Sequence, residues 1–335
     1  MKQFYSILFA MLISLLLIVG LLLFMGEDLK ALSEALNYTF LNRFGIGYTL
    51  YYTTPLIYTG LSVALCFHAG LFNIGAEGQL LWGAVSIVAL TKLFPHLHSW
   101  AALPLSFLIA AFAGGLWGFL PGYFKAKRGS HEVITTILLN FIALSCVNYL
   151  ILNPFKNPES QAAETSVLPE SYQLKTLWFP TTPVNASLIF AIVVAISIYI
   201  ILFKTSFGFE VRTMGKSQSA ALFSGISLSK RTLSIFMISG GLAGLVATNE
   251  VMGNEHKLIE GFSPGYGFTG IAVALLARNH PIGIIFSSFL FGSLQNFCRE
   301  LEFFSQNISK DISLILQGLL IILVSTRDFW LRNKK

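Results

Sequence analysis

The chain has 335 residues, of which 54% are apolar and 11% are charged, and its mean hydropathy is +0.69. Because a soluble globular domain carries roughly 25% charged residues, this composition excludes a soluble protein and predicts an integral membrane protein. The net charge of +6 then marks the cytoplasmic side of a membrane and not a nucleic-acid-binding surface.

The sequence contains no pattern typical of catalysis or metal binding. Cys66, Cys146 and Cys298 stand singly in apolar segments, so neither a disulfide nor a set of metal ligands is indicated. We find no residues that resemble a catalytic triad and no string of buried acids that could relay protons. We therefore expect no catalytic residue, no metal site and no cofactor in this chain.

The first apolar run covers residues 4–25 and follows Met1, Lys2 and Gln3. A signal peptide would begin in the same way. This run is longer than the usual signal core, however, and no small-x-small cleavage site precedes Gly26. We therefore expect residues 1–25 to form an uncleaved first transmembrane helix.

Apolar segments recur along the rest of the chain. About 20 apolar residues cross a bilayer as a helix, and this length predicts an all-α protein of about ten transmembrane helices. The eighth and ninth are the least well defined, since only His280 and Pro281 mark the break between them. The ten predicted spans are 4–25, 48–67, 76–93, 100–124, 132–152, 186–203, 232–251, 266–279, 281–298 and 311–326.

Basic residues indicate the orientation of these spans. With a cytoplasmic N-terminus, alternating segments that face the cytoplasm hold 14 of the 22 Lys and Arg residues. An even number of spans also places the basic C-terminal sequence RDFWLRNKK inside. We therefore predict an N-in, C-in protein with an ordered external loop at 153–185 and a basic cytoplasmic loop at 204–231.

The two halves of the chain share an order of features. In residues 48–152, FNIGAEGQ begins a span, and a Pro-containing turn, a Gly-rich span and HEVITTILLN follow. In residues 186–326, GFSPGYGFTG begins a span, and a Pro-containing turn, a Gly-rich span and KDISLILQGL follow. Five spans in each half give the halves opposite orientations, which predicts the 5+5 inverted repeat with discontinuous helices found in transporters.

The sequence FNIGAEGQ lies inside an apolar stretch that is too long for one span. Residues 48–93 would make a helix of about 69 Å, more than two bilayer cores, so the helix must break, and Gly70, Gly75 and Gly78 favour the break here. Asn73 is a candidate cap for the next helix and Glu77 stands in its first turn. The break is either a polar turn at the inner interface or a half-helix junction within the membrane. The absence of Lys and Arg from residue 44 to 91 favours the junction.

The cytoplasmic loop 204–231 contains two features of interest. GKS at 215–217 resembles the end of a phosphate-binding loop, but the first Gly is missing because Glu210 stands there, and no strand precedes it. This excludes a nucleotide site, so the chain does not hydrolyse ATP itself. Residues 216–226 predict a short helix ending near Gly225, which is either a docking element for a cytoplasmic partner or a surface connector.

Four stretches of the chain together carry a resemblance to a known family: GLFNIGAEGQLLWGA (70–84), RGSHEVITTILLNFIA (128–143), FGFEVRTMGKSQSAALFSGIS (207–227) and GFTGIAVALLARNHPIG (267–283). They resemble the permease subunit of ABC importers that serve nucleosides, ribose-type sugars and branched-chain amino acids. The combination of NIGAEGQ with EVITTILLN is similar to the first of the two permeases of nucleoside importers, which work with a basic-membrane-lipoprotein type binding protein. The resemblance runs from about residue 50 to 326.

The resemblance implies a multi-pass protein of a bacterial inner membrane that moves nucleosides inward by alternating access. Its implied partners are a second, related permease in a heterodimer, a cytoplasmic ATPase that holds ATP and Mg²⁺, and an extracytoplasmic substrate-binding lipoprotein. The implied ATPase-coupling residues are Arg212, Gly215, Ser219, Ala220, Ala221, Gly225 and Ile226. The candidates for lining or gating the path are Phe72, Asn73, Glu77, Gln79, Asn140, Asn249 and Phe268, of which the two Phe rings could stack on a base.

Three alternatives remain open at this stage. A permease of the same family could carry ribose-like sugars or another small polar solute. An ion-coupled secondary transporter would need buried acids, and Glu77 is nearly the only candidate. A membrane scaffold without transport activity would explain neither the interrupted span nor the loop that resembles a coupling segment.

Overall fold

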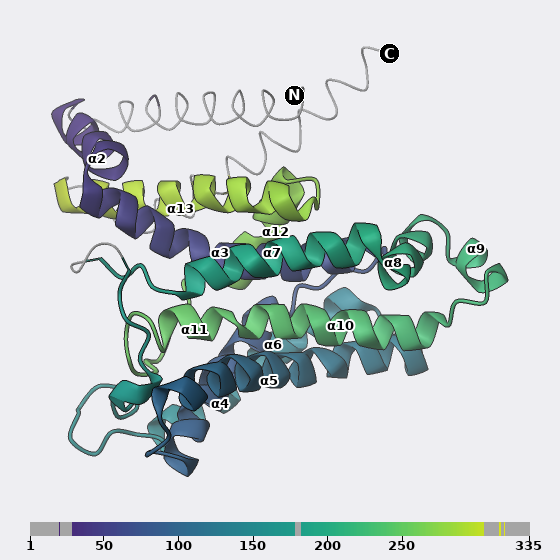
Figure 1. Ribbon diagram of the computed structural model, residues 1–335, viewed down its shortest axis with the longest axis horizontal. Coiled ribbons are helices and arrows are strands. Elements are labelled where there is room, and N and C mark those ends of the chain that lie inside the picture. Colours follow the sequence, from purple (N-terminus) through teal and green to yellow (C-terminus); the bar gives the residue numbers. More distant parts are fainter. Residues whose placement is uncertain (1–19, 21–28, 178–181, 305–314, 316–317, 319–335) are drawn as a thin grey trace.

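The computed structural model describes residues 20, 29–177, 182–304, 315 and 318. The predicted spans 4–25 and 311–326 lie outside these residues except at single positions. The described part is helical (Figure 1), and its only β-type pairings are isolated bridges.

The helices follow the chain from α2 to α13. In the first half they are α2 (Leu29–Leu41), α3 (Arg43–His68), α4 (Ala76–Leu93), α5 (Ser99–Arg128) and α6 (Glu132–Leu152). A single 3₁₀ turn, η1 (Glu170–Tyr172), interrupts the long loop that follows. In the second half they are α7 (Ser187–Lys204), α8 (Ser206–Lys216), α9 (Gln218–Phe223), α10 (Leu228–Gly244), α11 (Val246–Glu250), α12 (Tyr266–Leu276) and α13 (Pro281–Phe304).

Within the part of the chain that the structure describes, six segments are long and apolar enough to cross a membrane: Arg43–His68, Ser99–Arg128, Glu132–Leu152, Ser187–Lys204, Leu228–Glu250 and Pro281–Phe304. Each overlaps one predicted span. The predicted span 76–93 coincides with α4, which begins with polar residues and is not among the six. The predicted span 266–279 forms only the 11-residue α12, about 16 Å long, which is half of a bilayer core.

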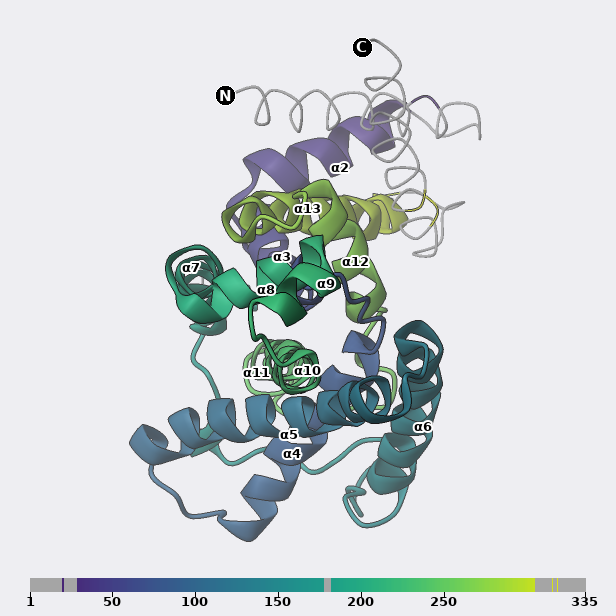
Figure 2. The same ribbon diagram turned by 90° about the vertical axis from the view of Figure 1, so that its right-hand side faces the viewer.

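Close contact between glycines holds the centre of the bundle together. Figures 1 and 2 place α10 between α5 and α3. Gly114 and Gly118 of α5 face Gly240 and Gly244 of α10 so closely that a Cβ on Gly114 would lie 2.4 Å from the Gly240 carbonyl oxygen. Small residues four apart allow two backbones to approach in this way, so the two GxxxG motifs, Gly114 to Gly118 and Gly240 to Gly244, pack α5 directly against α10.

The connections between helices gather at two opposite ends of the bundle (Figure 1). At one end, here the α9 end, α8 and α9 project and Arg231 pairs with Glu210. His68 Nε2 lies 2.9 Å from the Asn279 carbonyl oxygen, which brings the turn between α12 and α13 to the same end. The opposite end, here the loop end, holds the long loop 153–177 and the segment 251–265.

At the loop end, residues 153–177 are fastened to residues 251–260. Backbone hydrogen bonds join Thr165 N–H to Leu258 O at 2.9 Å and Leu174 N–H to Met252 O at 2.8 Å. Lys257 Nζ also pairs with a Glu164 carboxylate oxygen at 2.7 Å. We call this arrangement the clasp. Its contacts order a loop that has almost no regular secondary structure of its own.

Candidate functional site

The polar sequence FNIGAEGQ begins at the α9 end and reaches into the bundle. α3 ends at His68, and Gly70, with φ of +69°, turns the chain. α4 then begins at Ala76 among residues far from the helix ends: Asn140 lies eight residues into α6, and Ser239 lies eleven residues into α10. At 1.5 Å per residue these positions are about 12 to 16 Å deep. α4 therefore starts inside the bundle, as the half-helix interpretation predicts.

Three side chains hold the segment before α4 in place. The Asn73 amide donates to Gln79 Oε1 at 3.0 Å and to Ser239 Oγ at 2.8 Å, and Asn73 Oδ1 accepts the Gly75 N–H at 2.8 Å. Asn73 and Gln79 are fully buried. Because each polar group has a partner within the protein, irregular backbone is tolerated at this depth.

Asn140 of α6 caps α4 from outside that helix. Its Oδ1 accepts the Gly78 N–H at 2.8 Å, and its Nδ2 donates to the Ile74 carbonyl oxygen at 2.9 Å. Gly75, the N-cap residue, has no side chain to cap the helix. The free N–H groups of a helix start must find a partner, and here a neighbouring helix supplies it.

Glu77 links the starts of two short helices. One of its carboxylate oxygens accepts the backbone N–H of Gly267 at 2.7 Å, in the first turn of α12. Gly267 lies against Glu77 so closely that a Cβ there would come within 2.3 Å of the Glu77 backbone nitrogen. The carboxylate thus lies in the first turn of α4 and beside the first turn of α12, and negative charge is favoured at both.

The predicted path residues separate into two groups. Asn73, Gln79, Asn140 and Asn249 are buried and hydrogen-bonded within the protein. Phe72 and Glu77 are partly exposed, and Phe268 is 50% exposed. Only the second group has free surface for a ligand, and Glu77 lies next to the helix that carries Phe268.

Asn249 belongs to a different cluster, near the loop end. Its Oδ1 accepts from Asn185 at 3.2 Å, and its amide donates to Glu250 at 2.9 Å. The second Glu250 oxygen accepts the Tyr51 hydroxyl. The structure therefore buries Glu250 against α3.

The predicted coupling loop forms two helices where the sequence indicated one. Ser217 caps α9 by accepting the Ala220 N–H at 3.2 Å. Ser219 and Ala220 are exposed, and Phe223 is 93% exposed, whereas Ala221 is completely buried. α9 therefore presents a small exposed surface that ends at the solvent-exposed ring of Phe223.

The other predicted coupling residues lie on α8 and on the connection from α9 to α10. Gly215 touches the backbone of His68, where a Cβ would lie 2.2 Å from the carbonyl oxygen. The Arg212 guanidinium lies over the Phe203 ring, 5.2 Å from its centroid. Gly225 has φ of +76°, and Ile226 is buried. α8, which leads into α9, therefore contacts the ends of both α3 and α7.

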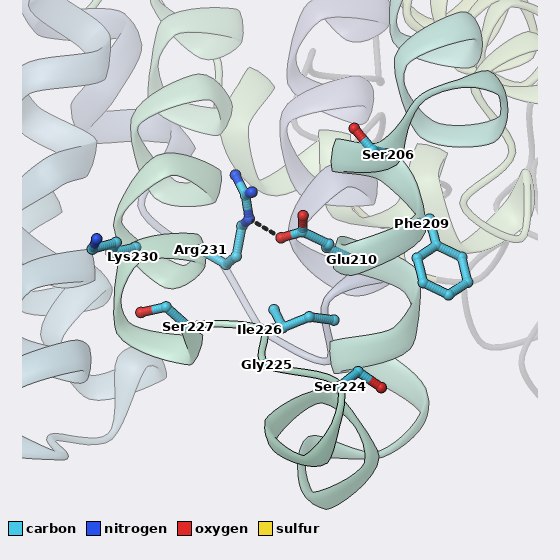
Figure 3. Close-up of a pocket in the computed structure, with 9 residues that line it drawn as sticks. All are labelled: Ser206, Phe209, Glu210, Ser224, Gly225, Ile226, Ser227, Lys230 and Arg231. Carbon is cyan, nitrogen blue, oxygen red and sulfur yellow. Dashed lines mark hydrogen bonds and ion pairs between the residues drawn. The ribbon is translucent and has the colours of Figure 1, made fainter.

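A cleft of about 440 Å³ lies between α8 and the start of α10. Figure 3 shows Glu210 and Arg231 pointing toward one another across it, with Ser224, Gly225 and Ile226 along the connection from α9. This connection and the ion pair join α9 to α10, the helix that carries Ser239. The cleft therefore lies beside the start of α10, and Ser239 of the same helix contacts Asn73 in the segment before α4.

Two residues of the junction were missed by sequence reasoning. Ser239 is buried within α10 and donates to the Ser62 carbonyl oxygen at 2.7 Å. Its only signal in the sequence is a polar side chain next to Gly240 in an apolar span. Gly267 was noted only as part of a stretch, because a close approach between distant residues leaves no local pattern.

The family described as "Branched-chain amino acid transport system / permease component" matches residues 45–325. The guanosine ABC transporter permease protein NupP of Bacillus subtilis (strain 168) is 38% identical over 255 residues, which cover 75% of this chain and 72% of NupP. The nucleoside ABC transporter permease protein NupB of Lactococcus lactis subsp. cremoris is 37% identical over 259 residues, or 75% of this chain and 71% of NupB.

The glucose ABC transporter permease protein TsgB13 of Haloferax volcanii is 33% identical over 307 residues, which cover 88% of this chain and 80% of TsgB13. No solved structure matches the chain significantly. The family match spans most of the chain and includes the junction, α8, α9 and α12. The chain therefore belongs to the family of permease components of branched-chain amino acid transport systems.

Proposed function

We propose that this permease is the transmembrane subunit of an ATP-driven ABC importer that moves nucleosides across the cytoplasmic membrane by alternating access. The observation that carries the proposal is its similarity to NupP and NupB, which are named for guanosine and nucleoside transport. The similarity to TsgB13, named for glucose, makes a sugar permease the second candidate. Nucleosides are neutral, which fits a junction whose only charged side chain is Glu77.

The proposed topology has ten spans, both termini in the cytoplasm and a 5+5 inverted repeat. Two observations support it. The α9 end carries Lys125, Lys127, Arg128, Lys204 and Lys230, as expected of a cytoplasmic face. α4 and α12 occupy corresponding places in the two halves, and their starts meet at Glu77, as broken helices of an inverted repeat do.

The transport path would pass along the exposed side of the junction. Phe72, Glu77 and Phe268 have exposed surface there, while the buried Asn73, Gln79, Asn140 and Asn249 keep the backbone in place. An ABC importer needs a second permease to close such an open side, and the resemblance to the first of a pair favours a related chain in a heterodimer.

The two ends would receive different partners. The cytoplasmic ATPase, which holds ATP and Mg²⁺, would contact Ser219, Ala220 and Phe223 on α9. Arg212, Gly215, Ala221, Gly225 and Ile226 would transmit its movement. Gly215 and Arg212 contact the ends of α3 and α7, and Ala221 and Ile226 are buried. The substrate-binding lipoprotein would dock at the loop end, where the clasp forms an ordered surface. No cofactor is needed in this chain.

Reconstitution tests the proposal. This chain, its partner permease, the ATPase and the binding protein are placed in liposomes and supplied with labelled guanosine, ribose or glucose. ATP-dependent uptake of guanosine is expected. Uptake of a sugar without guanosine would support the sugar permease instead. Uptake by this chain alone, driven by a proton or sodium gradient, would show a secondary transporter.

A further inference from the structure

A second cavity, distinct from the cleft between α8 and α10, lies at the loop end. It has a volume of about 470 Å³ and is formed by α3, the end of α11, the segment 254–264, the start of α12 and the end of α13. This volume is within the range of small-molecule sites, about 300–1,000 Å³. We call it the outer pocket.

Aromatic rings form one wall of the outer pocket. Tyr48, Tyr51 and Tyr52 follow one another on α3, and the rings of Tyr51 and Tyr52 lie 5.0 Å apart. Tyr51 is buried, while Tyr48 and Tyr52 are partly exposed. Partly exposed tyrosine rings offer a flat apolar face to a ligand ring and a hydroxyl for hydrogen bonding.

Carboxylates form the other side of the outer pocket. Glu250 is 3% exposed and is held by the Tyr51 hydroxyl and by Asn249. Glu255 is partly buried and accepts the Asn254 amide at 2.9 Å, while Glu260 is exposed at the mouth. These oxygens accept hydrogen bonds, so they suit a ligand that donates hydroxyl or amino hydrogens.

The charge of the outer pocket is unfavourable for anions. Its lining includes three Glu residues and a single basic residue, Arg299. Arg299 is already paired with Glu300, and its guanidinium lies 3.6 Å from the centroid of the Tyr48 ring. The remaining carboxylates would repel a phosphate or a carboxylate group.

We propose that the outer pocket is a selective binding site on the permease itself for a neutral ring compound with free hydroxyls, and that it rejects the phosphorylated form of the same compound. Since the inference rests on the proposed function, the expected ligand is a nucleoside. Tyr52 stacks on the base, and Glu255 and Glu260 accept hydrogen bonds from the ribose hydroxyls. The same two carboxylates, at the mouth of the pocket, repel a 5′-phosphate.

The clasp makes this a preformed site. The segment with Glu255 and Glu260 is fastened to the loop 153–177, where Glu260 N–H donates to the Ala163 carbonyl oxygen at 3.0 Å. Asn254 also donates to the Tyr51 hydroxyl at 3.0 Å. The acidic side is thus fixed relative to the aromatic wall before a ligand arrives, which lowers the entropy lost on binding.

Binding to the permease complex in nanodiscs, without the binding protein, tests the site. Labelled guanosine is titrated over the millimolar range, with guanosine 5′-monophosphate and ribose as competitors. Wild type is expected to bind guanosine at least about tenfold more tightly than the monophosphate, because the carboxylates of the pocket repel the phosphate group. Tyr52→Ala is expected to weaken guanosine binding about tenfold, because base–aromatic stacking is lost.

Substitution of Glu255 and Glu260 at the mouth of the pocket tests the selectivity against phosphate independently of the tyrosines. In the double variant Glu255→Gln/Glu260→Gln, the preference for guanosine over its monophosphate is expected to fall below about threefold. Tyr149→Ala, an exposed tyrosine of α6, is the control and should bind like wild type. An unchanged preference in the double variant would overturn the proposal, and so would a wild type that binds no guanosine.

Failure of this inference can be told apart from failure of the proposed function. If the complete importer takes up guanosine while the Tyr52 and Glu255/Glu260 variants bind as wild type does, the outer pocket is not a site and the function stands. If the complete importer takes up no nucleoside, the proposed function itself is wrong.

Discussion

The carboxylate of Glu77 accepts the backbone N–H of Gly267 at 2.7 Å, across 190 residues of sequence. This contact joins the starts of α4 and α12, the two short helices that begin inside the bundle. The first N–H groups of a helix have no partner within that helix, and a helix start carries a partial positive charge. One acidic side chain therefore stabilises an element of each half of the chain.

Two substitutions of Glu77 should distinguish the contribution of its charge to stability from the contribution of its hydrogen bond. Glu77→Ala leaves the Gly267 N–H without its partner and is expected to lower the free energy of unfolding by about 1–3 kcal/mol. Glu77→Gln keeps a carbonyl oxygen as acceptor and should lose less. Denaturant titration of the purified variants in detergent measures both. Equal losses in the two variants would show that the charge, and not the hydrogen bond, stabilises the junction.

Gly267→Ala tests the close approach between α4 and α12. A Cβ at this position would lie 2.3 Å from the Glu77 nitrogen and 2.7 Å from its Cα, both of which are backbone atoms that cannot rotate away. We expect a loss of about 1–3 kcal/mol in stability, together with slower ATP-driven uptake by the complex. Gly283→Ala is the control, because its nearest contacts are 3.3 Å or more. Wild-type stability in Gly267→Ala would contradict the packing described here.

Asn140→Leu tests the cap that α6 provides to α4. The change removes partners from the Gly78 N–H and the Ile74 carbonyl oxygen, and each unpaired buried group costs about 1–3 kcal/mol. Asn148→Leu, on the same helix and only partly buried, is the matched control and should be near neutral. Comparison of the two unfolding midpoints decides whether Asn140 caps α4 or only fills space.

Much of the helical fold could be predicted from the sequence, because the spans are recorded in local hydropathy. The predicted 132–152 coincides with α6, and the predicted 186–203 differs from α7 by one residue at each end. The need for a break in residues 48–93 followed from length, and the glycines of this stretch placed the break at FNIGAEGQ. α12 was predicted three residues too long, because the helix ends at Leu276 and the chain then turns, with positive φ at Arg278 and Asn279.

The candidate site was harder to predict, because the roles of polar residues depend on contacts between distant segments. Polarity placed Asn73, Gln79 and Asn140 near the path, yet the structure uses them to satisfy backbone and side-chain groups inside the bundle. Glu77 was expected to favour its own helix start, while its hydrogen bond to α12 could not be read from local sequence. The tyrosines of α3 also gave no signal, since they resemble ordinary membrane-helix residues.

Substitutions on α9 should uncouple ATP hydrolysis from transport. Phe223→Asp places a charge where a 93% exposed ring is proposed to meet the ATPase, and burying an unpaired charge in an interface costs several kcal/mol. Substrate-stimulated ATP hydrolysis by the assembled complex is expected to fall to the unstimulated rate.

The same measurement on three further variants locates the effect. Ala220→Asp, also on the exposed face, should act like Phe223→Asp. Ala221→Asp should instead destabilise the chain, because Ala221 is buried. Phe303→Asp, an exposed ring at the end of α13, should leave hydrolysis unchanged. Full stimulation in both Phe223→Asp and Ala220→Asp would place the ATPase contact elsewhere.

The clasp should weaken in acid. Hydrogen bonds from Lys257 and Ser160 hold the pKa of Glu164 below its ordinary value, about 4.3 in an unfolded chain. Because the folded pKa is the lower one, the ion pair contributes fully above the unfolded pKa, and this contribution is lost as the pH falls through the folded pKa. At about pH 7, Glu164→Gln should therefore raise amide hydrogen exchange in residues 163–174 relative to wild type. At about pH 3 the difference should shrink, since the wild-type carboxylate is then becoming protonated. A constant difference across this range would show that the Lys257–Glu164 pair does not hold the clasp closed.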